Sequence, residues 1–139
     1  MKLVIFLVLS TIVFLGCKKT TNHPVPSTPF SISINLNLPS YNALNGVGGY
    51  CYVQGGVQGI VVYRRSVEEF YAFDRKSPAG ASQCSYPLTV NTNNFLQLDD
   101  SCTFAKFSLY DGSAISGSEV GLRQYATQWN GSNILEIYN

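Results

Sequence analysis

The side chains that most often carry chemistry are scarce in this chain of 139 residues. It contains one histidine and four cysteines, namely His23, Cys17, Cys51, Cys84 and Cys102. A metal or catalytic site that uses histidine needs a second ligand or catalytic group nearby, and the Pro-rich segment around His23 offers none. We therefore expect no ligand role for His23. Asp99 and Asp100 are adjacent, and adjacent residues on a strand point to opposite faces. This favours a solvated acidic loop over a carboxylate pair.

The remaining candidates for catalysis lack the partners that they would need. Ser77, Ser85 and Ser101 are accompanied by no base that could activate a hydroxyl group. The glycine-rich stretches 46–49 and 55–56 are not followed by a helical pattern, so neither matches a phosphate-binding loop that opens a helix. We therefore expect that the protein is not an enzyme.

The first residues are typical of a targeting segment. Met1 and Lys2 give a short positive start, and the apolar run 3–15 follows. Thirteen residues of helix span about 20 Å, which is short of the ~30 Å hydrocarbon core of a bilayer. That length predicts a signal peptide over residues 1–16 rather than a membrane span.

The end of the apolar run adds a second signal. Gly16 directly precedes Cys17, and this arrangement resembles a bacterial lipobox, in which the cysteine becomes the acylated first residue of the mature chain. The resemblance implies a lipid anchor at Cys17 and a place in the bacterial cell envelope, with the domain in the periplasm or outside. The alternative is an ordinary signal peptide with an unrelated cysteine. Residues 17–29, which contain three prolines, are expected to form a tether.

The composition excludes one class of partner and favours one class of fold. Only 12% of the residues are charged and the formal net charge is +1, whereas a nucleic-acid binder normally carries a basic stripe. We therefore expect no nucleic-acid partner. Uncharged polar residues supply most of the polarity, and with glycine and tyrosine they suit strands and tight turns.

Residues 30–139 are expected to form one β domain. Apolar and polar residues alternate from Phe30 to Leu38, which predicts a strand with one buried face. The continuous apolar run 59–63 predicts a central strand that is buried on both faces. Further short strands are expected at 50–53, 70–73, 88–90, 95–98, 104–110, 125–129 and 134–138. The sequence thus predicts an all-β fold of at least eight short strands.

Two stretches lack clean strand periodicity, and they carry a family resemblance together with the strands beside them. Each irregular stretch, 74–87 and 99–103, contains one cysteine. The segments 59–66 and 70–79, with an aromatic-Asp-Arg sequence at 73–75, resemble the approach to the first cluster loop of Rieske iron–sulfur domains. Residues 106–117 and 122–125 are similar to segments that follow the second cluster loop. The resemblance spans roughly residues 41–139, and it is nearest to small lipid-anchored Rieske-like proteins of Bacteroidetes-type bacteria.

This resemblance implies an antiparallel β-sandwich with two apposed loops at one end, yet the family's cluster ligands are missing. The family uses Cys-x-His in the first loop and Cys-x-x-His in the second to bind a [2Fe-2S] cluster. Ser77 and Ala79 stand at the first pair of positions, and Asp100 and Thr103 stand at the second pair. A shift of the second loop by two residues would make Cys102 a ligand, but no register supplies a histidine. We therefore expect no bound cofactor and no metal.

The resemblance also implies a disulfide. Respiratory Rieske proteins carry one further cysteine in each loop, and on this pattern Cys84 and Cys102 form the pair. Such a bond is permitted outside the cytoplasm, and closing its loop would contribute roughly 3 kcal/mol. The alternative is two free thiols. Cys51 is expected to be a small buried apolar residue.

Two hypotheses on function remain. The first is a non-catalytic envelope lipoprotein with a degenerate Rieske-type domain, which serves as an interaction or structural module for an unknown envelope protein. The second is an electron-transfer protein that binds its [2Fe-2S] cluster through unconventional ligands.

Overall fold

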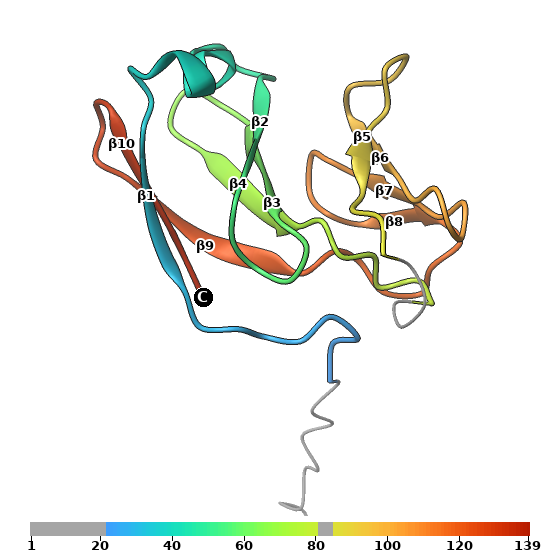
Figure 1. The fold of residues 1–139 in the computed structure, drawn as a ribbon. Coiled ribbons are helices and arrows are strands. Elements are labelled where there is room, and N and C mark those ends of the chain that lie inside the picture. The colour runs from blue at the N-terminus through green and yellow to red at the C-terminus, as the bar shows by residue number, and fades with distance from the viewer. Residues whose placement is uncertain (1–21, 81–84) are drawn as a thin grey trace, which may run out of the picture.

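The computed structural model describes residues 22–80 and 85–139, which form two antiparallel sheets side by side (Figure 1). The larger sheet has six strands in the order β1-β10-β9-β4-β3-β2. Their bounds are β1 Ser31–Asn35, β2 Tyr50–Val53, β3 Ile60–Arg64, β4 Phe70–Asp74, β9 Gln124–Trp129 and β10 Ile134–Tyr138. The smaller sheet comprises β5 Thr89–Val90, β6 Gln97–Asp99, β7 Lys106–Ser108 and β8 Ala114–Ser116. The prediction of an all-β antiparallel fold is confirmed.

The larger sheet curls around a core of its own. Ile34 from one edge strand and Val53 from the other belong to the same buried cluster, with side chains from the four strands between them. This requires the two edges to approach each other. The 3-10 helix η1, Pro39–Asn45, adds the fully buried Leu44 to the cluster.

A second core joins the two sheets. Val61 and Phe73 from the larger sheet pack in one cluster with Leu98 and Phe107 from the smaller sheet. Every residue of β3 from Ile60 to Tyr63 is buried, as the continuous apolar run predicted. The smaller sheet follows β4 in the chain and precedes β9, so both of its connections leave from the middle of the larger sheet.

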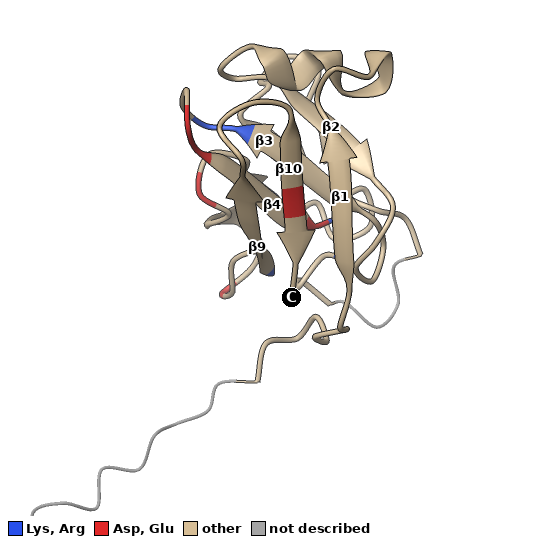
Figure 2. Ribbon diagram, turned by 90° about the vertical axis from the view of Figure 1, so that its left-hand side faces the viewer, with Lys and Arg blue, Asp and Glu red and all other residues tan. Residues whose placement is uncertain are grey.

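The polarity of the larger sheet comes mainly from uncharged side chains. Figure 2 shows almost no charge on the face formed by β1, β9 and β10, and Glu136 is the charged residue within these three strands. Side chains with hydroxyl and amide groups therefore make most of the polar contacts with solvent on this face.

Three local predictions differ from the structure. The first strand ends at Asn35 rather than Leu38, because the chain turns there and Pro39 starts η1. Phe104 is not part of a strand, since its φ of 61° places it in the left-handed region. Strand β8 was not predicted, because its three residues are half-buried or exposed and show no alternation.

The tether expected over residues 17–29 is corrected for its described part, residues 22–29. Val25 is fully buried, and its carbonyl accepts a hydrogen bond of 2.7 Å from Nε of Arg123. Nε2 of His23 donates to the carbonyl of Gly121 at 3.0 Å. The segment has no regular secondary structure, as its prolines predicted, but an apolar anchor and four hydrogen bonds to Gly121, Arg123 and Asn139 hold it against the domain. His23 therefore has a structural role at the start of the folded unit.

Candidate functional site

The four positions singled out by the family resemblance lie together where two loops meet beside the smaller sheet. The first loop leaves β4, and the second joins β6 to β7. A Cβ atom added to Gly80 in the first loop would lie 3.4 Å from Cγ2 of Thr103 in the second. The expectation of two apposed loops is confirmed by this approach.

Asp100 organises the second loop. It is only 3% exposed, and its Oδ1 accepts hydrogen bonds from the amides of Cys102 at 2.8 Å and Thr103 at 3.3 Å. Oδ2 accepts a hydrogen bond of 2.6 Å from the Thr103 hydroxyl. The main chain closes the turn, because the amide of Phe104 donates to the Asp100 carbonyl at 2.9 Å. The expected solvated acidic loop is therefore wrong for Asp100, whose carboxylate turns inward to these donors.

Asp99 does not join Asp100 in a carboxylate pair. Its two oxygens accept hydrogen bonds of 2.6 Å from the side chains of Asn91, which directly follows β5, and Gln97, which lies in β6. The two acids therefore serve separate networks, as the alternation of side chains along a strand predicts.

Ser77 connects the first loop to this network. Its side chain is 2% exposed, and its hydroxyl donates to the Asp100 carboxylate. The Ser77 Oγ also accepts a hydrogen bond of 3.2 Å from the amide of Ala79. Ser77, Asp100 and Thr103 thus form a continuous hydrogen-bonded group across the two loops, and Ala79 lies against it through its main chain.

This network shifts the acid–base equilibrium of Asp100. Burial acts to raise the pKa of its carboxyl, but the hydrogen bonds from Ser77 and Thr103 and from the loop amides outweigh burial. The pKa is therefore lowered from the usual 3.8. The carboxylate form is the one that the loops bind at neutral pH.

Asp74 fixes the start of the first loop, a role that sequence reasoning did not assign. It is fully buried and accepts hydrogen bonds from the amides of Lys76 at 2.7 Å and Val57 at 2.6 Å. Its Oδ2 also accepts from the Tyr125 hydroxyl at 2.6 Å, and burial together with Asp74 raises the pKa of that tyrosine. The aromatic-Asp-Arg signal at 73–75 marks this position, although the sequence alone does not show that the carboxylate is buried.

The residues at the four positions do not fit a [2Fe-2S] cluster. Ala79 has no donor atom, and the oxygens of Asp100 already accept hydrogen bonds from two hydroxyls and two amides. A Rieske site needs two thiolates and two imidazoles, and these positions supply neither. Over residues 22–80 and 85–139, no three His, Cys, Asp or Glu side chains form a group that could hold a metal ion.

The cysteines divide into two kinds. Cys102 is disulfide-bonded, whereas Cys51 is the free thiol among the described cysteines. Cys51 is buried in the first core, as expected, and burial raises its pKa to about 11, which leaves little thiolate at neutral pH. Cys84 and Cys17 lie outside the described residues. The Cys84–Cys102 pairing and the acylation of Cys17 therefore stay predictions.

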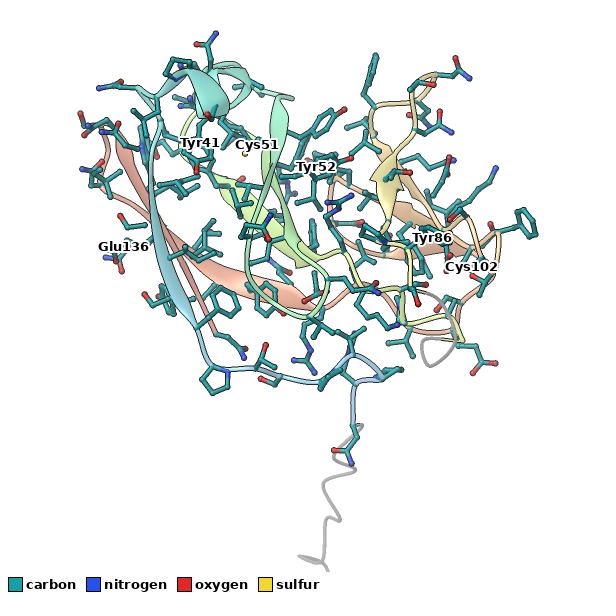
Figure 3. All side chains as sticks on the ribbon, in the orientation of Figure 1. Tyr41, Cys51, Tyr52, Tyr86, Cys102 and Glu136 are labelled. Carbon is teal, nitrogen blue, oxygen red and sulfur yellow. The ribbon has the colours of Figure 1, made fainter. Side chains whose placement is uncertain are left out.

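Two aromatic side chains near the loops are exposed to solvent. Tyr86 is 70% exposed and Phe104 is 81% exposed. Figure 3 shows Tyr86 and Cys102 at the same end of the smaller sheet. Phe104 also lines a hollow of about 200 Å³ with Asp99 and Lys106. Core packing therefore does not explain these two aromatics.

Comparisons with known proteins do not assign the chain to a family. No protein-family model matches the sequence, and no curated protein matches it either. In the part of the chain that the structure describes, no helix is long and apolar enough to cross a membrane.

Proposed function

We propose that the protein is a non-catalytic envelope lipoprotein whose domain has a Rieske-type scaffold without the cluster. The observation that carries this proposal is the buried Asp100 carboxylate, which accepts hydrogen bonds from Ser77 in one loop and Thr103 in the other. In the parent family the metal cluster joins the two loops at these positions. Here a hydrogen-bonded group makes the same connection.

Charge makes this connection strong enough to hold the loops. Hydrogen bonds to an ionised, buried group contribute roughly 1.5–3 kcal/mol each, about twice the value for neutral pairs. A disulfide between Cys84 and Cys102 would restrain the same loops covalently, with roughly 3 kcal/mol from loop closure. The scaffold can then keep its shape without metal, and its loop end presents Tyr86 and Phe104 to a partner in the envelope.

The docked segment 22–29 limits how far the domain can stand from a lipid anchor. If Cys17 is acylated, four residues lie between it and Asn22, and the five steps of a fully extended chain span at most about 18 Å. This proposal therefore places the domain close to the membrane surface rather than on a long flexible tether.

Iron content and spectroscopy test the proposal against the electron-transfer alternative. The full chain is produced anaerobically with iron and sulfide, and then analysed for metal, visible absorption and electron paramagnetic resonance. We expect a colourless protein with far less than one iron per chain and no Rieske-type resonance. Stoichiometric iron, at about two per chain as in a [2Fe-2S] cluster, with that resonance would overturn the proposal.

A further inference from the structure

A hollow beside the β2–β3 hairpin has the features of a ligand site, and it is separate from the two apposed loops. Its volume is about 380 Å³. The hairpin residues 54–59 line it together with Tyr52, Val53 and Arg75. Three of the six hairpin residues are glycines, so main-chain groups rather than side chains border much of the hollow. Arg75 is the charged residue in this lining.

Arg75 is held in a fixed orientation. Its Nε donates a hydrogen bond of 2.8 Å to the carbonyl of Leu88, and its guanidinium carbon lies 3.8 Å from the centroid of the Tyr52 ring. The Tyr52 hydroxyl is itself fixed, because it accepts a hydrogen bond of 2.9 Å from the amide of Val90. The planar guanidinium group is therefore positioned before any ligand arrives.

The rest of the guanidinium group faces the hollow. A Cβ added to Gly59, a residue of the lining, would lie 3.8 Å from the Nη1 atom of Arg75. Among the described residues, Nε is the side-chain nitrogen of Arg75 that has a hydrogen-bond acceptor, while its main-chain amide donates to the carbonyl of Gly59. The two terminal nitrogens thus present parallel donors, which is the geometry that binds an oxyanion through two hydrogen bonds.

No carboxylate neutralises this charge. All eight acidic residues of the chain lie within the described ranges, and none of them forms an ion pair with Arg75 there. The adjacent Asp74 is occupied by the hairpin amides and Tyr125. Burial lowers the pKa of Arg75, and only Tyr52 acts in the opposite direction. A half-buried cation without a counter-ion gains from an anionic ligand.

We propose that this hollow binds a phosphate group, held by the paired terminal nitrogens of Arg75 against the glycine-rich hairpin. This site differs from the phosphate-binding loops that precede a helix, because its positive charge comes from the Arg75 side chain. The hairpin lies at the same end of the domain as residues 22–30, which follow the proposed lipid anchor in the chain (Figure 1). A phospholipid headgroup is therefore one source of the phosphate, and a soluble phosphate compound is the other. Phosphate binding itself does not rest on the proposed function, whereas the lipid source does.

Nuclear magnetic resonance of the ¹⁵N-labelled full chain in detergent tests the proposal. Sodium phosphate is added at constant pH and ionic strength, and the resonances of the Gly55, Gly56 and Gly59 amides and of Arg75 Nε are followed. We expect saturable shifts at these positions. Arg75→Gln should weaken binding at least tenfold, and Arg75→Lys, which keeps the charge but loses the paired donors, should weaken it less.

Arg65 provides the matched control and nanodiscs distinguish the sources. Arg65 also stacks over tyrosine rings, at 4.9 Å from Tyr71 and 4.3 Å from Tyr110, but it does not line this hollow. Arg65→Gln should change phosphate affinity by less than twofold. The protein is also transferred to phosphatidylglycerol nanodiscs. If the same glycine resonances shift there, and Arg75→Gln abolishes the shifts, the phosphate belongs to a lipid headgroup. If they shift with inorganic phosphate but not in the nanodiscs, the ligand is a soluble phosphate compound. If neither condition shifts these resonances, or if Arg75→Gln and Arg75→Lys shift like the wild type, the proposal is wrong.

Discussion

Replacing Asp100 by asparagine tests whether a charged hydrogen-bonded group holds the two loops together. The change keeps the shape of the side chain but removes the charge that Ser77, Thr103 and two amides recognise. The two hydroxyl groups can reorient, so the bonds are weakened rather than lost. Charge contributes roughly 1 kcal/mol to each of these four bonds, and reorientation of the two hydroxyls recovers part of the loss, so we expect Asp100→Asn to lower the free energy of unfolding by about 2–4 kcal/mol at pH 7.

The pH dependence of this loss has a definite sign. The pKa of Asp100 is lowered in the folded protein, so its carboxylate stabilises the fold above the usual value of 3.8. That contribution disappears as the pH falls from 3.8 through the lower pKa of the folded state. Urea unfolding of wild type and Asp100→Asn without reductant should therefore show a difference at pH 7 that narrows towards zero below pH 3.8.

A double-mutant cycle isolates the bond that crosses between the loops. We expect Ser77→Ala and Asp100→Asn to show a coupling energy of about 1 kcal/mol, because Ser77→Ala removes the hydroxyl donor of this contact and Asp100→Asn removes the charge of its acceptor. Ser85→Ala is the control, since Ser85 is an exposed serine in the same loop. Additivity of the Ser77 and Asp100 changes within ~0.5 kcal/mol would refute the reasoning.

Three further predictions address the anchor, the disulfide and the hairpin. Cys17→Ser should release the protein from membranes, and a variant that still fractionates with membranes after a carbonate wash would refute the anchor. Thiol counting on the denatured, unreduced mature protein should find Cys51 alone, whereas reactive thiols at Cys84 and Cys102 would exclude their pairing. Gly56→Ala should lower the free energy of unfolding by more than ~2 kcal/mol in urea titrations, because its φ is 59° and a Cβ would overlap a buried carboxylate and a tyrosine hydroxyl. An alanine variant with wild-type stability would contradict that reason.

Much of the fold could be predicted because its strands have clear periodicity. Strand β3 is a continuous apolar run with both faces buried, and β10 alternates between buried and exposed residues. Strand β8 was missed because Ile115 is 53% exposed and supplies no buried face. The end of β1 was misplaced because Leu36 is buried outside the strand, so the alternation continues beyond the hydrogen-bonded residues.

The site was only partly predictable, for a different physical reason. The resemblance indicated that Ser77, Ala79, Asp100 and Thr103 belong to two loops at one end of the domain. The resemblance could not indicate that Asp100 is buried, because the groups that donate hydrogen bonds to Asp100 come from a loop distant in sequence and from the tight turn of its own loop. The docking of residues 22–29 was missed for the same reason, since the partners of Val25 and His23 lie near the other end of the chain.

The measurement that tests the central claim most directly is the restoration of a cluster in this scaffold. A variant with Ser77→Cys, Ala79→His, Asp100→Cys and Thr103→His carries the ligand set of the Rieske family at the four positions that the two loops bring together. We predict that the variant, expressed with iron and sulfide, binds about two irons per chain and gains the visible absorption and resonance of a Rieske cluster. A variant that keeps the wild-type circular dichroism but gains neither iron nor that resonance would contradict the assignment of a Rieske-type scaffold.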